Sequence, residues 1–351
     1  MTGSSQLRRR IAWQRGTIAV VAALIAMGAP ARAVESSRLT EKTGRIEVNA
    51  MEYPWSAIGR VNVAGRGFCT GFLIGERSVL TAAHCLYDQR EKRWRGVQEI
   101  HFVAGYQRDT YAINSPIARY RRSTLYDPRA TPGPDNAATD WAVLMLARPI
   151  GSQAGWLGVR ALSASLKARI ADGQAALIQA GYRQGWAQIM SVGFGCRLAG
   201  YFADGLGIAH RCNVARGDSG SPLLVLGDGR ISAVGLNVLD AWGRQGEIAG
   251  ALSMDVFRAG RGPRDAVRAF RATGAAWDHG KPPGRGSPAS PLPFRTIERL
   301  LGELGDLAVS KRAPAPADRR AAIEAFQART GLPVTGEASL ALLGRLIAAV
   351  N

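Results

Sequence analysis

Short apolar runs alternate with turn residues between residues 46 and 257. The runs are WSAIGRVNV, CTGFLIG, SVLTAAH, EIHFVAGY, WAVLMLA, AALIQAGY and PLLVLGDGRISAVGLNVL. Several alternate apolar and polar positions or are rich in β-branched residues, and Gly, Asp-Gly or Pro bounds many of them. This pattern is typical of strands joined by tight turns, and LGDGR at Leu226–Arg230 favours a hairpin. The pattern predicts a mainly β sandwich or barrel rather than alternating β and α units.

The hydrophobic period becomes helical over residues 296–351. Four apolar residues fall at i, i+3, i+4 and i+7: Ile297, Leu300, Leu301 and Leu304. The next segment, DRRAAIEAFQARTG, has Asp318 as a candidate N-cap and Gly331 as a stop signal, and GEASLALLGRLIAAV gives a third helix. We therefore expect a small three-helix domain at residues 296–351.

Two segments have neither pattern. Residues 34–45 are polar and charged, and we interpret them as a pro-segment or arm. Residues 258–295 are basic and rich in Pro and Gly, which predicts a semi-extended linker without a core of its own. Within that linker, DAVRAFRATGAAW is compatible with one short helix.

The first 33 residues have the pattern of a secretory signal peptide. Arginines at positions 8, 9, 10 and 15 precede an apolar stretch at Thr17–Met27, and ARA at Ala31–Ala33 is a small-x-small cleavage site. The apolar stretch is short for a bilayer span, and an uncleaved membrane anchor is the alternative. We expect an exported chain, secreted or periplasmic at the cell envelope, with no stable membrane span after signal cleavage.

Basic residues outnumber acidic ones in the chain of 351 residues, 45 against 27, for a formal net charge of +18. Loss of residues 1–33 removes five arginines and leaves +13. Such a charge favours anionic surroundings such as cell-surface polymers, although an Arg- and Ala-rich proteome would produce the same excess. No glycine-rich phosphate loop and no nucleic-acid motif is present, so we expect no cofactor and no nucleic-acid partner.

The chain has four cysteines, an even number, and all of them follow the predicted export signal in the sequence. This combination predicts an oxidising compartment and two disulfides. Zinc is the alternative. Because the sequence has no C-x-x-C pair and no clustered histidines, we expect no metal site.

Three motifs far apart in the chain carry candidate chemistry. TAAHC contains His84, TDWAV places Asp140 just before an apolar run, and GDSGSP places Ser219 in a glycine-rich turn. A nucleophilic serine needs a base, and the base needs an acid that holds its tautomer. In such a turn the backbone N–H groups of Gly217 and Ser219 can converge into an oxyanion hole. Each motif alone has an ordinary structural explanation, but the three in this order make chance a poor one.

These motifs resemble the chymotrypsin/trypsin-like serine peptidases, over about residues 45–257. YPWSAIGRV followed by CTGFLIGERSVLTAAHCLY is most similar to the bacterial, glutamyl endopeptidase-like branch. The resemblance implies two six-stranded antiparallel β-barrels with the active site in the cleft between them. It also implies His84 as general base, Asp140 as the carboxylate that orients it and Ser219 as nucleophile.

The resemblance further implies two disulfides, Cys69–Cys85 beside the histidine and Cys196–Cys212 before the serine turn. It implies too that Asp218 pairs with an α-amino group freed by a cut between Arg45 and Ile46. Cleavage elsewhere in residues 34–45 is the alternative, since many bacterial relatives mature differently.

Two asparagines fall where relatives select their substrates. Asn213 lies where trypsin-type members place the acid that selects Arg or Lys. Asn237 lies where glutamate-specific members place a histidine. We therefore expect a specificity pocket that accepts small or neutral side chains.

The C-terminal segment is similar to the second half of the peptidoglycan-binding-like three-helix domain. The matching residues are Phe326, Gln327, Gly331, Leu332, Gly336 and Leu342. ERLLGELGDL lacks the usual Gln and the glycine-rich turn of the first half. A small helical appendage with its own core is the alternative.

Together these expectations describe a secreted serine endopeptidase that acts on a protein or peptide, with a helical module that holds it near the envelope and possible contact with peptidoglycan. One alternative is a non-catalytic homologue that binds cell-wall or protein ligands. Another keeps the chemistry and makes the peptide stem of peptidoglycan the substrate.

Overall fold

The computed structural model describes residues 44–350 except 65–66, 228, 243–247, 276 and 309–311. The predicted signal peptide lies outside the described residues, as does all but the last part of the predicted arm. Among the helices of the described ranges, none combines the length and the apolar character needed to cross a membrane.

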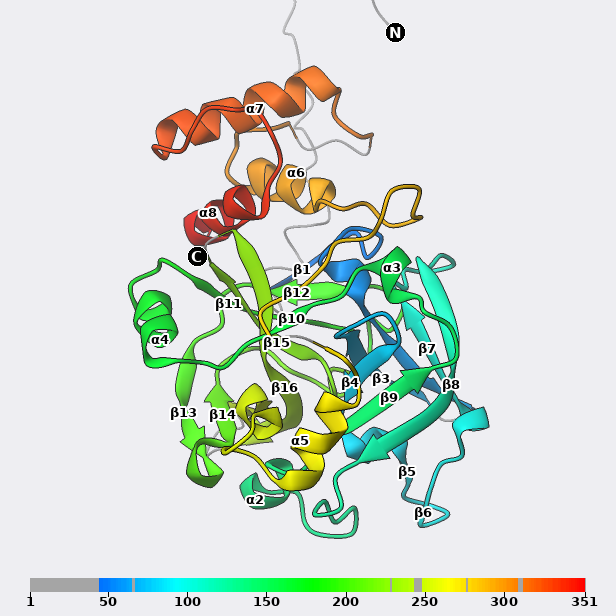
Figure 1. Cartoon of the computed structure of the whole chain (residues 1–351). Coiled ribbons are helices and arrows are strands. Elements are labelled where there is room, and N and C mark those ends of the chain that lie inside the picture. The colour runs from blue at the N-terminus through cyan, green and yellow to red at the C-terminus, as the bar shows by residue number, and fades with distance from the viewer. Residues whose placement is uncertain are drawn as a thin grey trace, which may run out of the picture. The chain divides into compact units, whose positions relative to one another are not determined.

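Six antiparallel strands in the first half of the chain close into a barrel (Figure 1). In order of pairing they are β2 (Ile58–Val63), β3 (Gly67–Leu73), β4 (Ser78–Thr81), β9 (Ala142–Leu146), β8 (Ile113–Arg122) and β7 (Ile100–Ala104). In β7, Ile100, Phe102 and Ala104 are buried whereas His101 is exposed, as expected of a strand with one face in the core. The first predicted barrel is confirmed.

A nine-stranded sheet forms the second half of the β structure. Its order is β1 (Arg45–Glu47), β12 (Ser191–Gly193), β11 (Ala176–Gly181), β15 (Pro222–Gly227), β16 (Arg230–Trp242), β17 (Ile248–Ser253), β14 (Gly207–His210) and β13 (Leu198–Phe202), and β10 (Gly158–Val159) pairs in parallel with β16. The predicted hairpin joins β15 to β16, where Gly227 faces Arg230. Across the described residues the ladder runs from the short strand β1 to β13, and the second closed barrel that we expected is not shown.

Shorter elements connect these strands. They are β5 (Tyr87–Asp88), β6 (Arg93–Trp94), the 3₁₀ helices η1 (Trp55–Ala57), η2 (Ala83–Leu86), η3 (Val97–Glu99), η4 (Ala203–Gly205) and η5 (Met254–Phe257), and the helices α2 (Pro134–Ala137), α3 (Gly151–Ala154) and α4 (Ala164–Ala171). The one that matters most for the site is η2, which follows β4 directly and carries His84.

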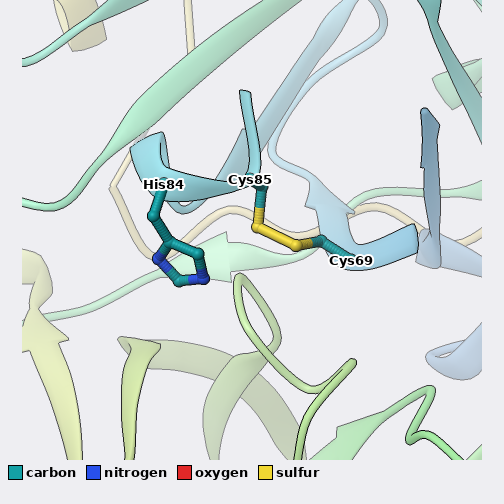
Figure 2. Close-up of side chains that lie close together, drawn as sticks. All are labelled: Cys69, His84 and Cys85. Atoms are coloured by element: carbon teal, nitrogen blue, oxygen red, sulfur yellow. A yellow bond between two sulfur atoms is a disulfide. The ribbon is translucent and has the colours of Figure 1, made fainter. Parts of the chain in front are cut away.

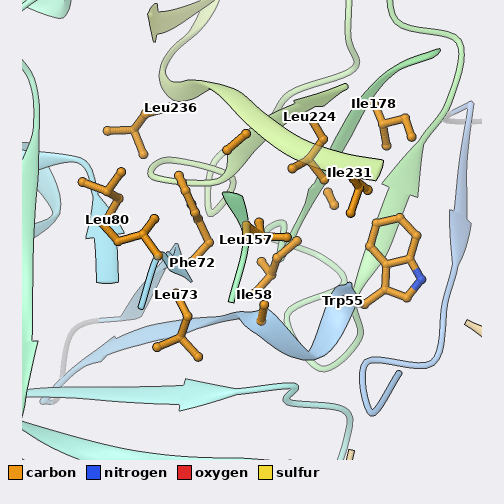
Figure 3. Packing of buried hydrophobic residues seen from close by; sticks show 14 of the residues in the cluster. Trp55, Ile58, Phe72, Leu73, Leu80, Leu157, Ile178, Leu224, Ile231 and Leu236 are labelled. Carbon is orange, nitrogen blue, oxygen red and sulfur yellow. The ribbon is translucent and has the colours of Figure 1, made fainter. Parts of the chain in front are cut away.

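Barrel and sheet share one apolar core (Figure 3). The labelled members are Trp55, Ile58, Phe72, Leu73, Leu80, Leu157, Ile178, Leu224, Ile231 and Leu236. Burying a side chain of this size contributes about 1.5–3 kcal/mol. Because Phe72 of the barrel and Leu224 of the sheet belong to the same core, the two halves that border the site are held together.

The C-terminal residues form three helices, as predicted: α6 (Phe294–Glu303), α7 (Pro316–Arg329) and α8 (Leu340–Val350). Ile297, Leu300 and Leu301 are buried in the same core as the strands. Helix α8 contacts β11, β15 and β16 (Figure 1). The helices are therefore packed on the sheet and do not have a separate core.

The segment interpreted as a linker contains helix α5 (Arg264–Arg271) and then runs along the β structure. The backbone N of Tyr53 donates to Ser290 O and that of Ser290 to Met51 O, each at 2.8 Å. The backbone N of Asp278 donates to Val159 O at 2.9 Å. A segment poor in large apolar side chains is thus attached through its backbone.

Glu52, which lies between β1 and η1, binds the end of this segment. Its carboxylate accepts hydrogen bonds from the backbone N of Arg295 at 3.0 Å, at the start of α6. Burial raises the pKa of Glu52 to about 7, against the opposing effect of these hydrogen bonds.

Candidate active site

A cavity of ≈560 Å³ has walls from both halves of the β structure. His84 and Asp140 line it from the barrel side, and Gly217 and Ser219 line it from the sheet side. The structure therefore brings together the residues that the three motifs single out, although they are distant in the chain.

His84 and Asp140 meet because their strands are neighbours. β4 pairs with β9 through Thr81 and Ala142, so η2 and the residues before β9 emerge at the same end. His84 Nδ1 lies 2.6 Å from Asp140 Oδ2, and the backbone N of His84 donates to Asp140 Oδ1 at 2.9 Å. When Nδ1–H donates to the carboxylate, Nε2 is the ring nitrogen left to accept a proton.

The environment of His84 favours its protonated form. Burial by itself lowers the pKa of the imidazole, but the charge and hydrogen bond of Asp140 raise it, and the charge of Asp240 adds to them. The net pKa of His84 is raised above its ordinary value. The His84 side chain is 29% exposed and that of Asp140 only 4%, so the ring can meet a bound molecule while the carboxylate stays protected.

The turn that carries Ser219 depends on two glycines with positive φ, Gly217 (95°) and Gly220 (80°). A Cβ on Gly220 would lie 2.2 Å from Thr70 O, and one on Gly217 2.7 Å from Tyr182 O. At both positions a residue with a Cβ would be strained by the positive φ and would clash with a neighbouring carbonyl oxygen, so glycine is required. Within the described part of the chain, the backbone N–H groups of Gly217 and Ser219 have no protein acceptor.

Backbone hydrogen bonds fix the turn to both halves. Thr70 N of the barrel donates to Ser219 O at 2.9 Å, and Gly220 N donates to Asn237 O of the sheet at 2.7 Å. Among the described residues no hydrogen bond joins His84 to Ser219, although both line the cavity. The hydrogen bond between a catalytic base and its nucleophile is often long or absent until a substrate binds.

Cys69 and Cys85 form a disulfide beside His84, with a Cα–Cα distance of 6.1 Å (Figure 2). It ties η2 to β3. Ligand atoms of these three residues lie within 4.8 Å of one another, but both sulfurs are bonded to each other and offer no thiolate to a metal. A second disulfide joins Cys196 to Cys212 and links the connection between β12 and β13 to the segment before the serine turn.

Asp218, the neighbour of Ser219, is fully buried and makes an ion pair with Arg45. Arg45 Nη1 lies 2.8 Å from Asp218 Oδ2. From the sequence we expected an α-amino group as the cation for Asp218, and the Arg45 side chain was not predicted as its partner. The acid directly before Ser219 was the signal in the sequence that a cationic partner had to be found.

The two asparagines expected in a specificity pocket lie elsewhere than on the cavity wall of the described residues. Asn237 is buried; its Nδ2 donates to Ser221 O and Oγ, and its Oδ1 lies 2.8 Å from His210 Nε2. Asn213 is exposed, and its backbone O accepts from Arg45. Burial lowers the pKa of His210 to about 4, so this imidazole is neutral at pH 7.

Three charged side chains that were not predicted from the sequence border the cavity. Arg129 comes from the barrel half, Arg216 precedes Gly217 and Asp240 lies near the end of β16. All three are exposed. Among the described residues that line the cavity, they are the charged groups other than His84 and Asp140.

Comparisons with known proteins agree with this architecture. The family model described as Trypsin matches residues 43–251. Glutamyl endopeptidase of Bacillus licheniformis is 30% identical over 118 residues, 34% of this chain and 35% of that protein. The chain thus matches about a third of the length of this curated relative. A solved Glu endopeptidase in complex with MPD superposes with a TM-score of 0.51 at 18% identity, over 67% of this chain and 98% of that one, which shows a shared fold.

Proposed function

The chain belongs to the trypsin family, and on that premise we propose that it is an exported serine endopeptidase that cleaves protein or peptide substrates. Ser219 is the nucleophile, His84 the general base and Asp140 the carboxylate that orients it. The observation that carries this proposal is the His84–Asp140 pair facing a cavity that Ser219 also lines.

Acylation begins when Ser219 Oγ attacks the substrate carbonyl and His84 Nε2 takes the hydroxyl proton. The imidazolium that forms is stabilised by the Asp140 carboxylate, which accepts a hydrogen bond from Nδ1–H. His84 then gives the proton to the leaving amine, and an acyl-enzyme remains on Ser219.

The charge that develops on the carbonyl oxygen needs hydrogen-bond donors. The N–H groups of Gly217 and Ser219, which find no protein acceptor among the described residues, supply them. Removing one such donor typically lowers the rate by about 10²–10³-fold. In the second half-reaction His84 activates a water molecule, which hydrolyses the acyl-enzyme and releases Ser219.

A fluorophosphonate probe tests this proposal directly. We expect the purified, exported form to be labelled on Ser219, Ser219→Ala to be unlabelled and the exposed-serine control Ser165→Ala to be labelled like the wild type. Absence of labelling, in the intact chain and after limited proteolysis upstream of Arg45, would favour the non-catalytic homologue that binds cell-wall or protein ligands.

For the specificity pocket we propose a preference for small or neutral side chains. Asn237 supports this, since its amide is held by Ser221 and His210 and brings no charge to the strand next to the serine turn. Asn213 likewise offers no carboxylate. A peptide-library cleavage profile tests it, and a strong preference for Glu, Lys or Arg at the cleaved bond would contradict it.

We also propose that the C-terminal helices keep the enzyme at the cell envelope, close to peptidoglycan. The support is the sequence likeness: buried Gln327 accepts from the backbone N of Thr335 and Gly336, both at 2.9 Å, and so organises the turn in which the likeness lies. Co-sedimentation of full-length Ser219→Ala with purified sacculi tests this, and failure to sediment at low salt would remove it. Release of stem-peptide fragments by the wild type would identify peptidoglycan itself as the substrate.

A further inference from the structure

The guanidinium of Arg45 is buried under the serine turn. Arg45 is the first residue of β1, and its Cα lies opposite Gly193 of β12. From there the side chain reaches Asp218 with both terminal nitrogens: Nη1 donates to Oδ2 at 2.8 Å and Nη2 to Oδ1 at 3.2 Å. Both side chains are completely shielded from solvent.

The same guanidinium binds backbone from three other segments. Nη1 donates to Asn213 O at 3.1 Å, while Nη2 donates to Ser191 O at 2.8 Å and Gly181 O at 3.3 Å. These carbonyls belong to the segment before the serine turn, to the start of β12 and to the end of β11. Arg45 therefore joins the turn to the sheet beneath it.

Asp218 connects the Arg45 side chain to the backbone of the serine turn through hydrogen bonds. Its Oδ2 accepts from the backbone N of Ala215 at 3.0 Å, and its own backbone N donates to Ala215 O at 2.9 Å. Gln179 Nε2 donates to Oδ1 at 3.0 Å. The loop from residue 215 to 218 is thus closed around the Asp218 carboxylate, directly before Ser219.

Space around the pair is reserved by glycine. A Cβ on Gly181 would lie 2.7 Å from Asp218 Oδ1, too close for any side chain there. An isolated buried carboxylate is strongly unfavourable, so the turn can keep this form only while a cation stays beneath it.

We infer that Arg45 is a positioning residue that holds the 215–219 turn in its active form in the uncut chain. The inference rests on the proposed function of Ser219. A cut between Arg45 and Ile46 is then unnecessary, and it would detach the residue that carries the guanidinium. Maturation that preserves activity must cut upstream of Arg45.

Substitutions at one position test this. In Arg45→Met the charge is lost, and we expect kcat to fall about 100-fold, as for a misplaced oxyanion donor, with a smaller change in KM. Arg45→Lys keeps the charge and recovers part of kcat. Arg108→Met is the matched control, because Arg108 pairs with Glu47 of the same strand but is exposed, and it should behave like the wild type.

A second measurement does not depend on activity. Hydrogen exchange of the backbone amides in residues 213–221 should accelerate in Arg45→Met and remain slow in Arg108→Met. Unchanged hydrogen exchange in Arg45→Met would overturn the inference about Arg45. Failure of the fluorophosphonate to label the wild type would instead count against the proposed function alone, so the two failures can be told apart.

Two other outcomes would also overturn the inference. One is a lower melting temperature in Arg45→Met with wild-type kcat per titrated active site, which is the mark of a purely structural role. The other is wild-type kcat in a chain that begins at Ile46, because a free α-amino group would then replace the guanidinium.

Discussion

The Asp140 carboxylate holds His84 at two points, the ring Nδ1 at 2.6 Å and the backbone N at 2.9 Å. The ring and the main chain of one residue are thus oriented by one buried side chain. Neither the tautomer nor the direction of Nε2 can change without breaking this pair.

Asp140→Asn should lower kcat by about 10⁴-fold with little change in melting temperature, because the amide favours the wrong tautomer of His84 while keeping the shape of the site. Steady-state kinetics on a peptide substrate measures the effect. Asp135→Asn, an exposed acid on α2, serves as the control and should be unaffected. A loss below tenfold in Asp140→Asn would contradict the role given to this carboxylate.

The acidic limb of the pH profile of kcat/KM should lie above the ordinary pKa of histidine, since the pKa of His84 is raised and only the neutral imidazole accepts a proton. Asp240→Asn removes one of the charges that raises this pKa, so its limb should move to lower pH. The exposed Asp172→Asn should leave the limb in place. An unchanged limb in Asp240→Asn would show that this carboxylate does not act on His84.

Gly220→Ala should abolish labelling of Ser219, because the new Cβ would lie 2.2 Å from Thr70 O at a φ of 80°. Gly173→Ala is the matched control: Gly173 also has a positive φ, 70°, but an added Cβ meets nothing within 4 Å. Comparing the two separates the cost of the backbone conformation from the clash in the turn. Equal labelling of both variants would contradict the geometry described for this turn.

Glu52 should make stability fall as the pH rises. Its pKa is raised from 4.5 to about 7, so the stabilisation is complete below pH 4.5 and is lost as the pH passes through 7. The cost of ionisation is on the order of 3 kcal/mol. Urea unfolding at pH 5 and pH 8 should show this loss in the wild type and in Glu303→Gln, an exposed control, but not in Glu52→Gln. Parallel pH dependence of all three proteins would refute the assignment.

Thr296→Val should destabilise the whole chain by about 1–3 kcal/mol, because it leaves the buried indole N–H of Trp55 without its acceptor at 2.9 Å. The double variant with Trp55→Phe should cost less than the sum of the two single changes. Calorimetry should show the β structure and the C-terminal helices unfolding in one transition. Two separate transitions would contradict the shared core.

The local features of the fold could be predicted from the sequence because each has a local cause. The β strands follow the short alternating runs, the hairpin follows LGDGR, and the three C-terminal helices follow the 3.6-residue period. The glycines around Ser219 likewise predict a tight turn. The triad assigned to the site remains a prediction, and the fluorophosphonate experiment is its test.

Long-range relationships were harder to predict. The ion pair of Arg45 with Asp218 joins residues 173 positions apart, and no local pattern in the residues around Arg45 indicates that partner. The attachment of residues 277–295 is made through their backbone groups, which every sequence has, whereas composition predicted only a semi-extended linker without a core of its own. The open nine-stranded sheet depends on where hydrogen-bond ladders end, which the alternation of side chains does not specify.

The distance between Arg45 and Asp218 along the chain also sets a time order for biosynthesis. A polypeptide leaves the ribosome from its N-terminus, so Arg45 is made long before the residues around Ser219. No nascent chain that ends before residue 218 can contain the ion pair, and even a finished chain gains it only when β1 has joined the sheet. If Arg45 positions the turn as inferred, β1, the first strand of the described residues, must join the sheet before Ser219 can react.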